Sequence, residues 1–171
     1  KGIKVGVLDL GFKGYDQLLG NGLPESVVAE SFVPGQQPQD SDEVHGTAVA
    51  EIVYEMAPDA ELYLAYYDGG DVSFGNAVNW LVSQGVNIIS HSAGGSLGPM
   101  DGSESDASIV DAVSAQGILW VNASGNEAGK HYRGTFTDTD GDGWHEFPSG
   151  SSAIGVLTNP SGAVVYLNWD D

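Results

Sequence analysis

The sequence predicts an α/β fold, a three-layer, doubly wound and mostly parallel β-sheet with helices on both faces. Two observations predict it. Short apolar runs rich in β-branched residues recur through residues 1–130, and segments with helical periodicity separate them. The chain has 171 residues, 41% of them hydrophobic. This is enough for one sizeable hydrophobic core, but the chain is too short for two full-sized domains. We therefore expect residues 1–130 to form one α/β domain and residues 131–171 to begin a β-rich appendage.

The first expected strand covers residues 3–8, a buried-type run of Ile, Val and Leu that Asp9 follows directly. A loop-rich segment comes next and contains an expected strand at 26–33. A helix is then expected at 44–56. Its apolar residues recur at helical spacing, which predicts that one face is buried and that His45 is held at the amino-terminal end. These apolar positions are Val44, Ala48, Val49, Ile52, Val53 and Met56.

Strands and helices alternate in the rest of the predicted domain. The remaining strands are expected at 60–66, 86–90 and 118–123. Between them a helix is expected at 72–84, with Asp71 as its amino-terminal cap. A second helix is expected up to Gln116, where Ser103 and Asp106 form the start of a capping box. Because each helix connects two strands, the strands should be parallel and covered on both faces.

Composition excludes several classes of function. The chain carries 24 acidic and 5 basic residues, a formal charge of -19, which repels nucleic acid and anionic membrane surfaces. It has no Cys, so a disulfide framework, a thiolate metal site and thiol catalysis are all excluded. No apolar run approaches the roughly 18 residues of a membrane-spanning helix. We expect neither a nucleic-acid partner nor a membrane partner.

Three functional groups are expected at the carboxyl edge of the sheet, where parallel α/β folds place their sites. Asp9 follows the first strand, and a carboxylate beside an imidazole would orient it and stabilise its protonated form. His45 begins a helix and has the placement of a general base. Asn126 follows the strand at 118–123, where its amide could donate a hydrogen bond to a developing oxyanion.

Four short sequence blocks carry these groups. They are Asp9-Leu10-Gly11, His45-Gly46-Thr47-Ala48-Val49-Ala50, Asn87-Ile88-Ile89-Ser90-His91-Ser92-Ala93-Gly94-Gly95 and Ala123-Ser124-Gly125-Asn126. In this order, with aspartate before histidine, they resemble the blocks of the subtilisin family of serine proteases. The resemblance covers the first 130 residues or so.

The resemblance implies hydrolysis of peptide bonds in peptide or protein substrates without a catalytic cofactor. Asp9 would orient His45, His45 would be the general base, and Asn126 would donate to the oxyanion. Ser92, Ala93 and Gly94 resemble the segment that pairs with the substrate backbone as an added strand. A secreted or cell-surface location is expected with this function.

The chain departs from the family pattern at three places. Leu10 stands where the family usually has Ser or Thr, which affects local hydrogen bonding. His91 replaces a usually apolar residue, and we interpret it as a histidine that fills space or pairs at the end of the sheet. The family's serine block is missing: the nearest similar residue, Ser152, precedes a segment broken by Gly and Pro that is unsuited to the required helix. The nucleophile is therefore expected in another part of the catalytic domain, and this chain alone should be inactive.

The segment after residue 130 contains an acidic loop. Asp138, Asp140 and Asp142 alternate with Thr139 and Gly141, which matches the first six positions of an EF-hand calcium loop, although Ser149 stands at the last position instead of Glu. Glu146, at the ninth position of the loop, could supply a further oxygen. A calcium site and a metal-free Asp/Gly turn both fit this pattern. Short strands are expected nearby at 144–147, 153–157 and 163–169.

Two other functions fit the same sequence. One is a pseudo-protease, a peptide-binding module that has the cleft without the serine. The other is a calcium-dependent scaffold or adhesion module that acts through residues 130–171. The chain starts on an expected strand and stops without a turn or cap, so we expect it to be part of a longer protein.

Overall fold

The computed structural model describes residues 2–95, 102–126, 131–153 and 155. The described residues divide into two compact units, the first ending at Gly125 and the second beginning at Asn126. All helices and strands of the described residues lie in the first unit. No helix among the described residues is long and apolar enough to cross a bilayer.

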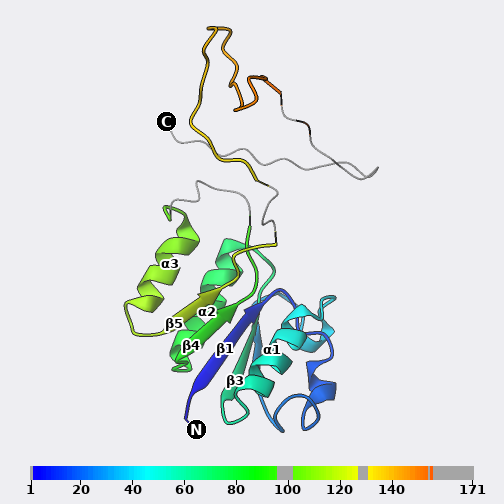
Figure 1. The fold of residues 1–171 in the computed structure, drawn as a ribbon. Coiled ribbons are helices and arrows are strands. Elements are labelled where there is room, and N and C mark those ends of the chain that lie inside the picture. Colours follow the sequence, from blue (N-terminus) through cyan, green and yellow to red (C-terminus); the bar gives the residue numbers. More distant parts are fainter. Residues whose placement is uncertain (1, 96–101, 127–130, 154, 156–171) are drawn as a thin grey trace. The chain divides into compact units, whose positions relative to one another are not determined.

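Five parallel strands form the sheet of the first unit, in the order β2-β3-β1-β4-β5 (Figure 1). They are β1 Lys4–Asp9, β2 Val28–Ser31, β3 Glu61–Tyr66, β4 Ile88–His91 and β5 Leu119–Asn122. β1 lies at the centre because its apolar side chains are buried on both faces of the sheet. The chain adds strands first on one side of β1 and then on the other, which confirms the predicted doubly wound α/β fold.

Helices cover both faces of this sheet, as Figure 1 shows. They are α1 His45–Met56, α2 Asp71–Ser83 and α3 Ser105–Ser114, with short 3-10 helices at Tyr15–Leu18 and Pro38–Asp40. α1 packs on β1 and β3 from one side, while α2 packs on the same strands and α3 on β5 from the other. Gly70 and Glu104 are the amino-terminal caps of α2 and α3, so the predicted caps Asp71 and Ser103 are each one residue out of place.

Alternate side chains along the strands are buried in two separate hydrophobic cores, one on each face of the sheet. The α2 side buries Leu8, Ala65 and Ile89 against Phe74 and Leu81 of α2. The α1 side buries a second set against Ala50 of α1. That set includes Val5, Val7, Phe12, Leu23, Leu62 and Leu64. This alternation follows from the two-residue period of a strand, and as a result the side chains on both faces of β1 are buried from solvent.

The buried face of α1 differs from the prediction. The structure buries Gly46, Thr47 and Ala50 against the sheet. The predicted buried positions divide into half-buried and exposed ones. Val49 and Val53 are half-buried, whereas Val44, Ala48, Ile52 and Met56 are exposed. This helix has two neighbouring stripes of small or apolar residues. The stripe with the smaller side chains faces the sheet, because it allows the helix backbone to approach β1 closely.

The sheet face that carries α1 is incompletely covered. By the strand registers, Leu119 and Val121 of β5 point to the same side as Val5 and Val7 of β1. Both β5 side chains are exposed, and the main contacts of α1 with the sheet are with β1 and β3. We use the name open face for five exposed apolar residues on this side of the sheet. They are Val44, the amino-terminal cap of α1, with Ile52 and Met56 of α1, and Leu119 and Val121 of β5.

The described part of the second unit has no strand or helix. The strand predicted at 144–147 is therefore wrong, and those predicted at 153–157 and 163–169 lie almost wholly outside the described residues. The segment is instead held by side chains. His145 packs against Tyr132, Phe136 and Phe147, and its Nδ1 accepts a hydrogen bond of 3.0 Å from Thr137 N–H. Aromatic contacts and side-chain bonds to the backbone take the place of a β-ladder here.

Candidate active site

The ends of β1 and α1 bring Asp9 and His45 together. Asp9 is the last residue of β1 and His45 the first of α1. His45 Nδ1 lies 2.8 Å from Asp9 Oδ2 and 3.1 Å from Oδ1. The carboxylate is 1% exposed and the imidazole 54% exposed. A buried acceptor therefore holds the proton of Nδ1, and the other ring nitrogen, Nε2, can accept a proton from a group that arrives from solvent.

Two glycines permit this approach of helix to strand. Gly46 N–H donates to Gly11 O at 2.9 Å, which fixes the first turn of α1 against the loop after β1. A Cβ at Gly46 would lie 2.6 Å from Gly11 O and 2.7 Å from both Asp9 Cβ and a ring carbon of Phe12. No other residue type fits there without a shift of backbone. The pairing of Asp9 with His45 therefore depends on the glycine next to the histidine.

The protonation of Asp9 reflects its burial. Burial raises the pKa of the Asp9 carboxyl above its ordinary value. Three smaller effects lower this pKa without cancelling the rise: the hydrogen bond to His45, the electrostatic attraction to His45 and the hydrogen bond from Leu10 N–H. Leu10 N–H donates to Asp9 Oδ1 at 2.8 Å. The backbone thus supplies a hydrogen bond at the position where the family usually has Ser or Thr, so the departure at Leu10 leaves the carboxylate bonded.

Ser92, Ala93 and Gly94 leave the sheet beside this pair. β1 and β4 pair Leu8 with His91, so Ser92 continues the chain at the level of Asp9. Ser92 and Ala93 are half-buried, Gly94 is exposed, and the three residues adopt neither helix nor strand. Their backbone lies at the carboxyl edge of the sheet, and its pairing with an extended peptide stays a prediction.

The remaining predicted catalytic group, Asn126, lies in the second unit. Asn126 is its first residue, so the role of Asn126 as oxyanion donor stays a prediction. Ser152 lies in an irregular stretch of the described residues and begins no helix. The pair that the structure brings together is therefore Asp9 with His45.

His91 belongs to a polar cluster that sequence reasoning did not assemble. Its Nε2 lies 2.8 Å from Tyr67 Oη, and its Nδ1 lies 2.7 Å from Asn122 Oδ1. Burial lowers the pKa of His91 and raises the pKa of Tyr67 to about 12, so both side chains are neutral at neutral pH. The available sequence signal was that Tyr67, His91 and Asn122 each stand at the carboxyl end of an expected strand. Their contact also depends on the order of the strands in the sheet, which the sequence does not predict.

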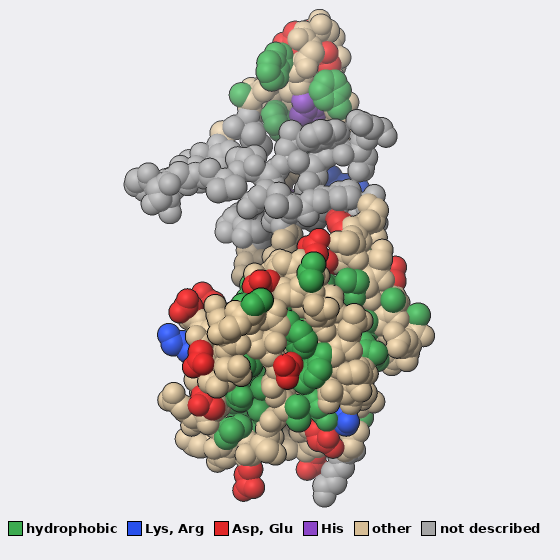
Figure 2. All heavy atoms as spheres, turned by 180° about the vertical axis from the view of Figure 1, so that it is seen from behind, with side chains coloured by type: hydrophobic (Ala, Val, Ile, Leu, Met, Phe, Trp, Pro, Cys, Tyr) green, Lys and Arg blue, Asp and Glu red, His purple; other side chains and the backbone are tan. Residues whose placement is uncertain are grey.

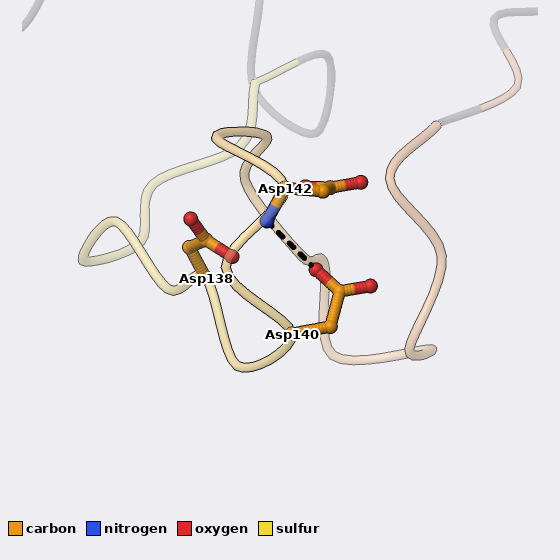
Figure 3. A group of neighbouring side chains, drawn as sticks. All are labelled: Asp138, Asp140 and Asp142. Carbon is orange, nitrogen blue, oxygen red and sulfur yellow. Dashed lines mark hydrogen bonds between the residues drawn. The ribbon is translucent and has the colours of Figure 1, made fainter.

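The acidic loop of the second unit brings three of its four predicted ligands together. One carboxylate oxygen from each of Asp138, Asp140 and Asp142 lies within 4.8 Å of the others (Figure 3). Asp142 N–H donates to Asp140 Oδ1 at 3.2 Å, and Asp138 accepts from two backbone N–H groups further along the turn. Glu146 is not part of this group, and its carboxylate accepts hydrogen bonds from the backbone and hydroxyl of Thr139.

Comparison with known proteins matches this architecture. A sequence model described as the subtilase family matches residues 1–159. Subtilisin BL of Lederbergia lenta is 32% identical over 139 residues, which are 73% of this chain and 48% of that protein. Alkaline elastase YaB of Bacillus sp. (strain YaB) is 31% identical over 139 residues, 34% of its length. The chain thus spans about half, or less, of the curated relatives that it matches.

Two solved structures share the fold. The prenylagaramide maturation protease PagA superposes with a TM-score of 0.50 at 22% identity, over 73% of this chain and 46% of that one. MycP1 with its N-terminal propeptide removed superposes with a TM-score of 0.54 at 23% identity, over 82% and 48% of the two chains. At this level of identity the likeness concerns the fold alone.

Proposed function

Because the chain belongs to the subtilase family, we propose that it is the amino-terminal part of a serine endopeptidase that hydrolyses peptide bonds in peptide or protein substrates. The observation that supports this most directly is the bond of 2.8 Å between His45 Nδ1 and the buried Asp9 carboxylate. An exposed imidazole oriented by a buried carboxylate is the base and orienter of a catalytic triad.

In the proposed reaction, His45 Nε2 takes the proton of a serine hydroxyl as the serine oxygen attacks the scissile carbonyl. Asp9 keeps the ring in the tautomer with hydrogen on Nδ1 and stabilises the imidazolium. Asn126 donates to the oxyanion of the tetrahedral intermediate, and the substrate backbone pairs with Ser92, Ala93 and Gly94. The imidazolium then gives the proton to the leaving amine. Water next attacks the acyl group left on the serine, with the same proton transfers through His45, and the acid is released.

The serine is proposed to come from the rest of the catalytic domain. The match spans 48% of subtilisin BL, so a similar length has no counterpart in this chain. The open face supports the same proposal, because its residues Leu119 and Val121 lie on a sheet face that α/β folds normally cover. Without a covering layer these apolar side chains are left in water. By itself the chain of 171 residues is proposed to be inactive.

Covalent labelling tests this proposal. A fluorophosphonate probe reacts with an activated serine, so the longest natural form of the protein should be labelled and the 171-residue chain should not. His45→Ala in the longest form should lower the labelling rate by about a thousandfold or more, because removal of a triad member has effects of this order. His131→Ala, at an exposed histidine of the second unit, is the matched control and should be labelled like wild type.

Two results would contradict the proposal. Equal labelling of the His45→Ala variant and wild type would refute the role of His45. An unlabelled longest form that still binds peptides would instead favour the alternative, a pseudo-protease that retains the cleft without the reaction. A secreted or cell-surface location is proposed along with the peptidase and rests on the same family resemblance.

We also propose that Asp138, Asp140 and Asp142 bind Ca²⁺. One oxygen from each of the three carboxylates lies within 4.8 Å of the others, and carboxylate oxygens are ligands that suit this cation. Calcium titration by calorimetry should show binding to the chain and none to Asp140→Ala, with Asp16→Ala as a control at an exposed carboxylate in the first unit. Absence of binding to wild type would identify a metal-free Asp/Gly turn and would also end the alternative of a calcium-dependent scaffold.

A further inference from the structure

Three side chains link the carboxyl ends of β3, β4 and β5. We name this cluster of Tyr67, His91 and Asn122 the polar bridge. His91 ends β4 and Asn122 ends β5, while Tyr67 directly follows β3. β1 lies between β3 and β4 in the sheet, so the Tyr67–His91 bond of 2.8 Å crosses the end of the central strand. The Tyr67–His91 bond therefore connects β3 and β4, which are not neighbours in the sheet, whereas the His91–Asn122 bond joins the neighbouring strands β4 and β5.

With His91 neutral, the hydrogen bonds of the polar bridge have one consistent arrangement. Asn122 Nδ2 donates to Ala123 O at 2.8 Å, which turns Oδ1 toward His91 Nδ1 and Trp120 Nε1. An amide oxygen only accepts, so His91 Nδ1 must carry the hydrogen. In neutral imidazole Nε2 is then an acceptor, and the Tyr67 hydroxyl donates to it.

The surroundings of His91 keep it in this state. The ring centroid lies 5.5 Å from that of Phe74, 5.7 Å from Trp120 and 5.8 Å from Tyr67, and the residue is buried. The charged groups that act on it are Asp9 and Asp106, which favour protonation, but burial outweighs them and the pKa of His91 is lowered. His91 is thus neutral at neutral pH, and its two directional hydrogen bonds are its contribution to the polar bridge.

The polar bridge lies at the origin of two segments of the candidate active site. Ser92, the first residue of the proposed substrate-binding segment, directly follows His91. The carbonyl of His91 accepts a bond of 3.0 Å from Ala123 N–H, where the chain leaves β5 toward Ser124 and Gly125. One residue therefore holds the starting points of both segments, by its side chain and by its backbone.

We propose that His91 is a positioning residue for peptide substrates: through the polar bridge it sets the direction in which Ser92–Gly94 and Ala123–Gly125 leave the sheet. The inference rests on the proposed function, since these segments bind a substrate backbone only if the chain is part of a peptidase. An apolar residue at position 91 would fill the same space without aligning three strand ends.

The tautomer of His91 is the first test, made on the complete 171-residue chain. Long-range proton–nitrogen correlation spectra should show His91 neutral at pH 7, with hydrogen on Nδ1 and none on Nε2. Tyr67→Phe, which removes only a hydroxyl group, should change the Nε2 chemical shift of His91. Hydrogen on Nε2, or an imidazolium at pH 7, would overturn the proposal.

Amide hydrogen exchange is the second test and separates positioning from general stability. His91→Met should accelerate exchange at Ser92–Gly94 and Ala123–Gly125 by about tenfold over its effect on the rest of the sheet. His91→Gln, which offers one donor and one acceptor, should restore part of the protection. The control Val86→Ala removes buried volume of the same core just before β4 and should show no such selectivity. Uniform acceleration in His91→Met would overturn the proposal.

Peptide binding then connects the polar bridge to substrate. A blocked oligoalanine peptide should shift the amide signals of Ser92–Gly94 in wild type, with a Kd about tenfold higher in His91→Met and unchanged in Val86→Ala. Equal Kd values for wild type and His91→Met would overturn the positioning proposal. If wild type gives no shift at all, the proposed function fails at this segment, and the tautomer and exchange results still decide whether the polar bridge positions both segments.

Discussion

Asp9 is the residue of the candidate active site whose burial is least favourable. Its carboxylate is 1% exposed and is held by His45 and the N–H of Leu10. These contacts are fewer than an ionised carboxylate accepts in water, and accordingly the pKa of Asp9 is raised. The arrangement sacrifices stability at neutral pH for an oriented imidazole, a trade commonly found at catalytic sites.

The variant Asp9→Asn tests this trade. Between the ordinary pKa of 3.8 in the unfolded chain and the higher pKa in the folded chain, the folded state binds more protons. The contribution of Asp9 to the free energy of unfolding is therefore most favourable below pH 3.8 and is lost as the pH rises through the folded pKa. We expect Asp9→Asn to gain stability over wild type as the pH rises to 7, measured by urea unfolding at several pH values. Asp16→Asn, at an exposed carboxylate, is the control. A gain that does not change with pH would contradict the role of ionisation.

Ser41 stabilises the segment that connects β1, which ends at Asp9, to α1. It is 1% exposed, accepts a bond of 2.8 Å from Phe12 N–H and donates one of 2.8 Å to Pro38 O. Ser41→Ala should lower the free energy of unfolding by about 1–3 kcal/mol, because it leaves the buried Phe12 N–H without its acceptor. Ser83→Ala, which removes a bond of 2.7 Å at the exposed end of α2, should change it by less than about 0.5 kcal/mol. Similar effects in urea unfolding would contradict this account.

At the scale of residues, the sequence predicted what depends on position along the chain. Asp9 and His45 could be placed because each stands at an element boundary that hydrophobic periodicity locates. The Tyr67–His91 contact could not be predicted in this way, because it depends on the order of strands in the sheet and passes over β1. The side-chain partner of Glu146 was missed for a similar reason, since its carboxylate turns to Thr139 and away from the three aspartates.

Helix α1 is the element on which the candidate site depends, and its contact with β1 is closest at Gly46. Gly46→Ala should destabilise the chain by about 1–3 kcal/mol, because the new methyl group meets backbone and ring atoms that have no free space. The same substitution at Gly75 in α2 meets only Ile109 Cδ1 at 3.8 Å and should stabilise the chain by about 0.5–1 kcal/mol through helix propensity.

The pair Gly46→Ala and Gly75→Ala is measured by thermal or urea unfolding. A second readout is the imidazole proton on Nδ1 of His45, whose chemical shift should move in Gly46→Ala as the bond to Asp9 lengthens and stay unchanged in Gly75→Ala. Changes of the same sign at both glycines would show that the close approach at Gly46 does not limit the packing of α1.

The elements themselves could largely be predicted, and their environment only in part. The five strands and three α-helices that the structure describes in the first unit occur close to the expected residues, because apolar periodicity and glycine turns determine them locally. The buried face of α1 was assigned to the wider apolar stripe, although the close contact with β1 selects Gly46, Thr47 and Ala50. The strand expected at 144–147 failed because aromatic residues there pack around His145 instead of joining a sheet.

The molecule as a whole carries many more negative than positive side chains. Figure 2 shows Asp and Glu side chains spread over one face with few Lys or Arg among them, in agreement with the net charge of -19. Like charges at this density favour solubility and oppose self-association. The open face is the contrasting feature, since its five residues are apolar and exposed. An apolar surface on a strongly acidic chain indicates a specific covering partner, which we have proposed to be the rest of the catalytic domain.

Charges placed on the open face test that arrangement. Ile52 is 62% exposed and Val121 is 49% exposed, so Ile52→Lys and Val121→Lys should each change the stability of the 171-residue chain by less than about 0.5 kcal/mol. In the longest natural form the same changes should destabilise by about 3 kcal/mol or more, because the covering layer would bury an unpaired charge. Val72→Lys is the control: this residue of α2 is 80% exposed, and its substitution should be mild in both forms. If Ile52→Lys and Val121→Lys are equally mild in the longest form, the open face stays in contact with water and the serine must be presented from another side of the sheet.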